Sequence, residues 1–141
     1  MSKERTHTIA DTLAEFVAGL QPQHVPQAVL KRARHLMLDA VGIAHASTHY
    51  DFAHRSLSAA QELSGNGGDT PVIGLAARLA PRDAMLMNGI LIHGLDFDDT
   101  HAAGVIHATA STLPCALGSA ALAGRDGEAL LNRLGAHAEE R

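Results

Sequence analysis

Apolar residues recur every three or four positions along much of this chain, which is the spacing of an amphipathic helix. The first such run extends from Thr8 to Leu20, and either Thr6 or Thr8 is placed to cap its N-terminus. The pattern therefore predicts an amphipathic first helix, with one apolar side and one polar side.

A second helix is expected from Pro26, which suits a first helical turn, to about Ser47. Its early part carries three basic side chains, whereas its later part is apolar apart from Asp39 and His45. The helix should therefore pass from the surface into the core, which makes Asp39 a candidate buried carboxylate. We expect Asp39 to serve as a hydrogen-bond partner of a neighbouring segment rather than as a catalytic group.

Turn residues mark the limits of the elements that follow. A third helix is predicted over Phe52–Leu63, and the Gly-rich residues 64–69 predict a flexible loop that lacks the pattern of a phosphate-binding loop. Residues 70–74 and 77–79 are expected to pair as a short hairpin. A central helix should then run from Pro81 to about Phe97, because nearly every face of it is apolar.

The last predicted helix starts near Ser111 or Thr112, with Pro114 in its first turn, and runs to Ala123. The whole pattern predicts an all-α helical bundle with one short β-hairpin near residues 70–80. At 141 residues the chain is expected to form a single domain.

Composition and charge limit the kinds of partner and the cellular location that we expect for this chain. Hydrophobic residues make up 46% of the chain but aromatic residues only 3%, so small and aliphatic side chains must build the core. Eleven basic against 15 acidic residues, without a basic stripe, argue against a nucleic-acid partner. Because no apolar run reaches the ~18 residues of a membrane span and no signal peptide is evident, we expect no membrane partner and a cytoplasmic location. The single Cys115 excludes an internal disulfide and is expected to be a small core residue.

Polar residues with catalytic potential concentrate where the central helix is expected to end. His93, Asp96 and Thr100 are spaced i, i+3 and i+7, so they would share one face if helical geometry continued that far. The other two acids, Asp98 and Asp99, would then point elsewhere. Three carboxylates at a helix C-terminus oppose the helix dipole, which favours a functional site over simple capping of the helix exit.

A histidine and two hydroxyls follow this cluster. His107 can donate or accept a proton near neutral pH, and Asp96 would orient it. Ser111 and Thr112 lie at an expected helix N-terminus, whose free amides are suited to a ligand carboxylate or phosphate. These two hydroxyls, together with His93, are therefore candidate substrate-binding residues, although a lone histidine on an apolar helix is often only a hydrogen-bonded core residue.

An alternative interpretation uses the segment Asp96–Thr100, which matches DxDxT, the nucleophile motif of Mg²⁺-dependent phosphohydrolases. That motif normally follows the first strand of a doubly wound sheet, and residues 90–92 would have to form that strand. The later part of the chain predicts helix and offers no further acidic metal motif, so this alternative is the less favoured one.

The same residues resemble the N-terminal part of the MmgE/PrpD family. The most specific match begins at Asn88 and reads NG-x3-H-x-LDFDDTH-x5-H, followed by a small-residue helix with a proline. Supporting matches are LMLDAVGIA in the second helix, TPVIGLAARLAPRDAMLMNG before the motif and AGRDGEALL after it. The resemblance covers the chain from about Thr8 to Leu131.

This resemblance implies a lyase-type chemistry and assigns roles to residues. The family includes 2-methylcitrate dehydratase, cis-aconitate decarboxylase and iminodisuccinate epimerase, and its members are usually homodimers that need neither a metal nor an organic cofactor. Asp96, Thr100 and His107 match the family's active-site Asp, Thr and His. The implied reaction is proton transfer at a carbon next to a carboxylate of a small di- or tricarboxylate; dehydration, decarboxylation and epimerisation all remain open.

The chain departs from the family in length. Members are several times longer, with an α/β domain after the helical one, and their sites also use later His and Lys residues. Residues 1–141 are therefore expected to be an apparently truncated N-terminal helical domain with a partial site, ending in the polar tail Asn132–Arg141. Association as a dimer or with a missing C-terminal half is expected. A non-catalytic association module or a gene remnant is the competing interpretation.

Overall fold

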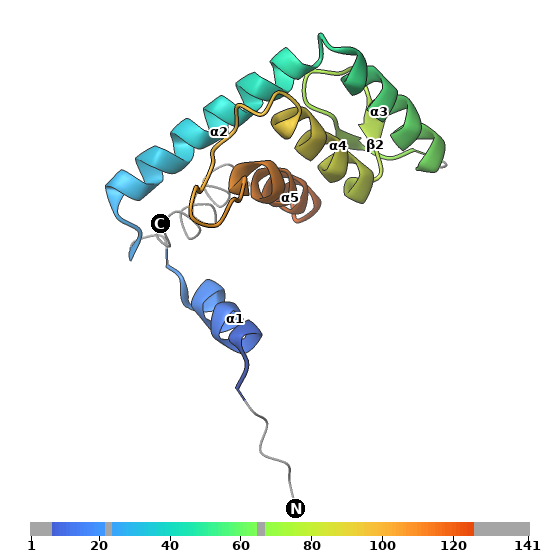
Figure 1. Ribbon diagram of the computed structural model, residues 1–141. Helices are drawn as coiled ribbons and strands as arrows, with labels where there is room; N and C mark the ends of the chain where they lie inside the picture. The colour runs from blue at the N-terminus through green and yellow to red at the C-terminus, as the bar shows by residue number, and fades with distance from the viewer. Residues whose placement is uncertain (1–6, 22–23, 65–66, 126–141) are drawn as a thin grey trace, which may run out of the picture.

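The computed structural model describes residues 7–21, 24–64 and 67–125 (Figure 1). These residues form five helices and one antiparallel two-stranded sheet, which confirms the predicted all-α class with a short hairpin. In chain order the elements are α1 (Ile9–Gly19), α2 (Gln27–Ser47), α3 (Asp51–Leu63), β1 (Thr70–Pro71), β2 (Arg78–Leu79), α4 (Pro81–His93) and α5 (Ala108–Leu122). The predicted polar tail and part of the Gly-rich loop lie outside the described residues.

Helix α4 is the centre of the bundle. It packs against α5, α2 and α3 and also contacts both strands, and Figure 1 shows the long α2 crossing over α4 and α5. Because α4 is covered on several sides, Met87, Leu91 and Ile92 are fully buried, as the all-round apolar pattern predicts. The rest of the core consists mainly of small and aliphatic side chains: Ala40, Ala44, Ala53, Val72, Leu79, Ala84 and Leu113.

Two glycines allow α4 and α5 to approach closely. A Cβ atom on Gly89 of α4 would lie 3.0 Å from the carbonyl oxygen of Ala110, and one on Gly118 of α5 would overlap the side chain of Met85. The two backbones can therefore pack with little side-chain volume between them. This contact sets the position of the start of α5 beside the end of α4.

The first two helices begin almost where the sequence predicts. Thr8 caps α1 through a reciprocal pair of hydrogen bonds with Asp11, of 3.2 Å from the Asp11 amide and 2.9 Å to the Asp11 carboxylate. Pro26 lies one residue before α2, and its carbonyl oxygen accepts bonds from the amides of Val29 and Leu30. Helix α2 ends at Ser47, as predicted.

Two side chains expected in the interior are exposed. Asp39 is on the outer side of α2, because the inward side repeats at Ala40, Ile43 and Ser47, and the prediction of a buried carboxylate was therefore wrong. Cys115 on α5 is also exposed, so the prediction that it is a core residue was wrong. No helix within the described ranges combines the length and the apolar character that crossing a membrane requires.

The boundaries of α4 and α5 differ from the predicted ones. Helix α4 ends at His93 instead of Phe97, and α5 begins at Ala108, before the hydroxyl residues expected at its start. Pro114 consequently lies inside α5 and not in its first turn. Both differences arise in the connection between the two helices, which also forms the candidate site.

Candidate functional site

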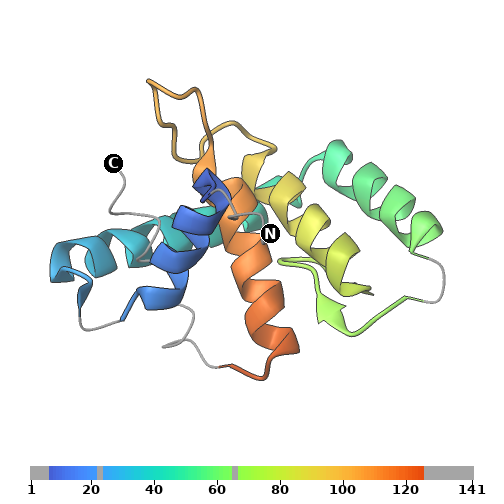
Figure 2. The same cartoon turned by 90° about the horizontal axis from the view of Figure 1, so that it is seen from below.

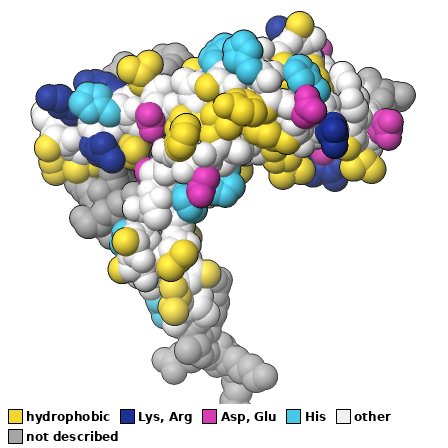
Figure 3. Space-filling model, turned by 45° about the horizontal axis from the view of Figure 1, so that its top comes forward, with side chains coloured by type: hydrophobic (Ala, Val, Ile, Leu, Met, Phe, Trp, Pro, Cys, Tyr) yellow, Lys and Arg dark blue, Asp and Glu magenta, His cyan; other side chains and the backbone are white. Residues whose placement is uncertain are grey.

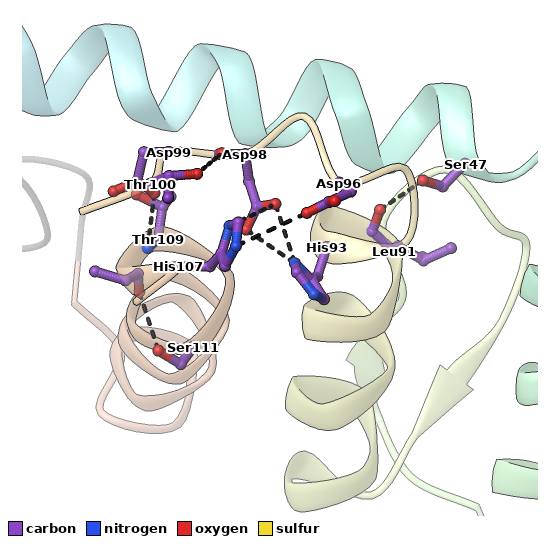
Figure 4. Close-up of polar contacts among 11 residues, drawn as sticks. Ser47, Leu91, His93, Asp96, Asp98, Asp99, Thr100, His107, Thr109 and Ser111 are labelled. Carbon is purple, nitrogen blue, oxygen red and sulfur yellow. Dashed lines mark hydrogen bonds and ion pairs between the residues drawn. The ribbon is translucent and has the colours of Figure 1, made fainter. Parts of the chain in front are cut away.

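The C-terminal end of α4 is held in place by α2 and α3. The hydroxyl of Ser47 on α2 donates a buried 2.6 Å hydrogen bond to the carbonyl oxygen of Leu91 (Figure 4). This carbonyl belongs to the last turn of α4, where oxygens lack an intrahelical partner. The ring of Phe52 on α3 packs against Gly94, where a Cβ atom would overlap it. The position of His93, the last residue of α4, is set by these two contacts.

The chain turns sharply after α4. The amide of Asp96 donates to the carbonyl oxygen of His93 at 2.8 Å, and Asp96 adopts the left-handed conformation with a φ of 56°. Aspartate tolerates this conformation better than most residues because its short side chain is polar. The helix therefore stops before Phe97, although the apolar pattern continues.

A projecting loop then returns the chain to α5. His101 and Ile106 pair across an isolated antiparallel bridge, and the amide of Gly104 donates to Nδ1 of His101 at 3.0 Å. Figure 2 shows this connection extending away from the helices. It delivers His107 as the residue that immediately precedes α5, next to the end of α4.

Four side chains converge between the two helix ends: His93, Asp96, Asp98 and His107 (Figure 4). We call them the His–Asp cluster. Oδ1 of Asp98 lies 3.1 Å from Nδ1 of His93 and 3.4 Å from Nδ1 of His107. Oδ1 of Asp96 lies 3.8 Å from Nε2 of His107, and the two imidazole rings have centroids 4.7 Å apart at 60°. One carboxylate is thus shared by two imidazoles.

Exposure changes steeply across the cluster. The side chain of Asp98 is 1% exposed and that of His107 26%, whereas His93 is 52% and Asp96 80% exposed. The cluster therefore has a buried side at Asp98 and an open side at Asp96. Nδ1 of His107 faces the buried carboxylate, while Nε2 faces the open side, where a ligand can approach.

The structure brings together only some of the predicted site residues. Asp96 and His107 meet as expected, and His93 joins them. The hydroxyl of Thr100 donates to the backbone carbonyl of Asp98 at 3.4 Å, so it borders the cluster. Ser111 and Thr112 both donate to the carbonyl oxygen of Ala108 within α5, at 3.0 and 2.8 Å, and neither makes a hydrogen bond to the cluster.

The prediction that Asp96 and Thr100 share a helical face with His93 was wrong. Because α4 ends at His93, Asp96 and Thr100 are loop residues, and Asp96 reaches the cluster through its left-handed turn. Asp98, expected to point elsewhere, is the central carboxylate. The spacing of residues along the sequence does not predict this position of Asp98, because only the path of the loop brings its carboxylate close to both histidines.

Asp99 has a structural role at the start of α5. Its Oδ1 accepts a 3.0 Å hydrogen bond from the amide of Thr109, in the first turn of the helix. A carboxylate at this position is favoured by the helix dipole and satisfies an amide that lacks an intrahelical partner. This interaction accompanies a start of α5 that is earlier than predicted. One amide at the N-terminus of the helix, where free amides were predicted to face a ligand, therefore already has a partner.

A groove runs beside the loop but does not include the cluster. It is lined on one side by α2, including His35, Leu38 and Asp39, and on the other by Leu95 and Phe97. None of the four cluster residues lines it. Leu38 and Phe97 are both largely exposed at its edges.

The DxDxT alternative loses its structural basis. Residues 90–92, which would have to form the strand before the motif, lie in the last turn of α4. The strands among the described residues are the two short ones of the antiparallel hairpin. They do not form the parallel sheet that such phosphohydrolases need.

Comparison with known proteins gives a consistent result. Residues 11–139 match the model of the MmgE/PrpD N-terminal domain. The cis-aconitate decarboxylase-like protein oryM of Aspergillus oryzae is 31% identical over 108 residues, which are 77% of this chain and 22% of that protein. The cis-aconitate decarboxylases of Mus musculus and Homo sapiens are 28% and 31% identical over 108 residues, or 76% of this chain and 22% of each enzyme.

The match includes the whole of the connection between α4 and α5, so the His–Asp cluster lies inside the matched domain. The chain spans about a fifth of the length of these relatives. The chain belongs to the MmgE/PrpD family, within its N-terminal domain.

Proposed function

We propose that the His–Asp cluster transfers a proton at a carbon next to a carboxylate of a small di- or tricarboxylate, in the manner of a decarboxylase or dehydratase. The observation that supports this most strongly is His107, which has a buried carboxylate at Nδ1 and an open side at Nε2. The names of the relatives, cis-aconitate decarboxylases, favour a tricarboxylate and decarboxylation.

The geometry suits general acid–base catalysis. Oδ1 of Asp98 lies 3.4 Å from Nδ1 of His107 and attracts the ring from its buried side, which leaves Nε2 to exchange a proton with a substrate. In a decarboxylation, the bond between the carbon and its carboxylate breaks, CO₂ leaves, and the electron pair stays on the carbon. A protonated His107 then supplies the proton that this carbon takes up. In a dehydration, the neutral ring would instead remove the C–H proton, the electron pair of that bond would form the alkene, and the hydroxyl would leave as water after a second acid protonates it.

Binding of the substrate's carboxylates needs positive charge beyond what the cluster holds. In the ion pairs of the His–Asp cluster, His93 and His107 are the positive partners. His93 and the exposed loop near Thr100 are proposed to contact one carboxylate group. We propose that further cationic groups come from an associated chain, either a second copy or a protein that carries the remaining family domains.

The test is an assay of the purified chain with cis-aconitate, citrate and 2-methylcitrate. Release of CO₂ and the change in alkene absorbance would be followed for the wild type and for His107→Ala, with His54→Ala on the exposed side of α3 as matched control. Loss of general acid–base catalysis should reduce turnover by about 10²–10⁴-fold in His107→Ala. Equal turnover in the two variants, or a folded wild type without turnover on any of the three substrates, would contradict catalysis by this chain.

A second candidate function, association without catalysis, is favoured by α1. None of its residues is buried, although Ile9, Leu13, Phe16 and Val17 form one apolar stripe along it. Figure 3 shows hydrophobic side chains on this helix and in a larger patch over the body of the molecule. An apolar stripe of this length is typical of a helix that packs against a partner.

We propose a second copy of the chain as that partner. Analytical ultracentrifugation should then show a dimer whose dissociation constant rises at least tenfold in Leu13→Glu. Ala18→Glu, on the opposite side of α1, is the matched control and should dimerise like the wild type. A monomer at all concentrations would contradict this association.

A further inference from the structure

The arrangement around Asp98 has an unusual feature for a simple hydrogen-bonded pair. Nδ1 of His93 and Nδ1 of His107 both face the same oxygen, Oδ1 of Asp98, at 3.1 and 3.4 Å. Nδ1 of His107 is buried and makes no hydrogen bond, in spite of that short distance. A buried polar atom without a hydrogen bond needs an explanation, and a bound ion is one that fits the imidazole and carboxylate groups around this nitrogen.

These distances match the spacing of ligands around a small metal ion. Zinc in proteins is tetrahedral, with bonds of roughly 2.0–2.2 Å to nitrogen and oxygen, so its ligand atoms lie about 3.4 Å from one another. The two measured nitrogen–oxygen separations lie within 0.3 Å of that value. One ligand atom from each of His93, Asp96, Asp98 and His107 lies within 4.8 Å of every other.

We propose that the His–Asp cluster binds a divalent transition-metal ion of the Zn²⁺ type. Two imidazole nitrogens with two carboxylates suit zinc, cobalt and related ions, whereas Mg²⁺ and Ca²⁺ prefer ligand sets made only of oxygens. His93, Asp98 and His107 form the core of the site, and Asp96 is the fourth ligand on the open side. The two carboxylates also neutralise the charge of the ion.

The local structure favours such a site before any ion binds. Ser47 and Phe52 hold the end of α4, and the Asp99 interaction with the Thr109 amide holds the start of α5, so the two histidines need little rearrangement. Because Asp98 is almost fully buried, one side of the site excludes water.

Metal binding uses Nδ1 of His107, whereas the proposed proton transfer uses Nε2 of the same ring. With an ion at Nδ1, the neutral ring keeps its proton on Nε2 and has no lone pair there to accept another one. Bound metal should therefore inhibit turnover, and a chelator should restore it. The family resemblance implies a reaction without a metal, and an inhibitory site is compatible with that.

The experiment is a titration of the metal-free chain with Co²⁺, followed by visible absorption. Tetrahedral Co²⁺ with nitrogen and oxygen ligands absorbs far more strongly between about 500 and 650 nm than octahedral Co²⁺ does. We expect one equivalent to saturate this band and Zn²⁺ to displace it. The affinity for Co²⁺ should fall more than tenfold in each of His93→Ala, Asp98→Asn and His107→Ala. His54→Ala should bind Co²⁺ as tightly as the wild type.

A second measurement follows metal binding in the wild-type chain and uses the variants only to assign signals. Ring-proton NMR signals of the wild-type histidines should be recorded while Zn²⁺ is added, with those of His93 and His107 assigned through the single variants. The proposal expects these two signals to shift together at one equivalent while those of His45 and His54 stay in place. Weak octahedral absorption only, or shifts confined to other histidines, would overturn it.

Discussion

Oδ1 of Asp98 lies 3.4 Å from Nδ1 of His107, and this buried carboxylate is the central group of the site. Asp96, on the open side of the same ring, is largely exposed. The two aspartates therefore differ in how much each stabilises the fold, even though both contact His107.

We expect Asp98→Asn to lower the free energy of unfolding by about 1 kcal/mol, since hydrogen bonds to a charged acceptor contribute more than neutral ones. Asp96→Asn should change it by less than about 0.5 kcal/mol, as is usual for an exposed side chain. Asparagine also tolerates the left-handed backbone at position 96, so the comparison is matched. Urea denaturation followed by circular dichroism measures both values, and equal losses would contradict the central role of Asp98.

The hydrogen bond from Ser47 to the Leu91 carbonyl should contribute measurably to stability. Ser47→Ala leaves a buried carbonyl oxygen at the end of α4 without this donor, and we expect a loss of about 1–3 kcal/mol. The control is Ser58→Ala on α3, whose hydroxyl makes an exposed bond to the His54 carbonyl and should matter by less than about 0.5 kcal/mol. A loss in Ser47→Ala no larger than in Ser58→Ala would show that α2 does not hold the end of α4.

Two glycines should respond to alanine in opposite directions. Gly42 is in the middle of α2 with no atom within 4 Å of its would-be Cβ, so Gly42→Ala should raise the free energy of unfolding by about 0.5–1 kcal/mol. At Gly94 the added methyl overlaps the ring of Phe52, and Gly94→Ala should lower it by about 1–3 kcal/mol. The same denaturation assay measures both. Phe52→Leu in the Gly94→Ala background should recover part of the loss, and a failure to do so would argue against this contact.

The start of α4 should make stability sensitive to acid. The Arg82 guanidinium donates to Asp83 at 2.8 Å and, together with a 2.5 Å bond from the Ser64 hydroxyl, holds the pKa of Asp83 below its ordinary 3.8. Because the folded pKa is the lower one, the stabilisation is complete above about pH 4 and is lost as the pH falls through the folded pKa. Thermal unfolding between pH 2 and 7 should therefore show a difference between wild type and Asp83→Asn that shrinks below pH 4. A constant difference would mean that this carboxylate does not titrate with unfolding.

Much of the fold follows from local patterns. The apolar period predicted α1, α2 and α3 within a residue or so at each end. Thr8 was one of the two threonines predicted to cap α1, and its hydrogen bonds are made within the first turn. The hairpin was predicted from turn residues and pairs as expected at Thr70–Pro71 and Arg78–Leu79. These features depend on residues that are close together in the sequence, so the sequence pattern is enough to predict them.

The site is different, since each of its defining contacts joins residues that the pattern does not relate. The apolar run past His93 predicted a longer α4, but contacts from α2 and α3 and the left-handed turn at Asp96 end the helix earlier. Asp99 starts α5 at Ala108 by a hydrogen bond across the loop, which no local propensity indicates for a helix that contains Pro114.

The sequence by itself therefore determined the helical class, most of the element boundaries and the family resemblance from which Asp96, Thr100 and His107 were predicted as site residues. Only the tertiary structure decided that Asp98 is the central carboxylate, that two histidines share it, and that the Ser111 and Thr112 hydroxyls bond within their own helix. The physical reason is that burial and side-chain geometry in a loop depend on the helices packed on either side of it. The loop's own residues do not specify them.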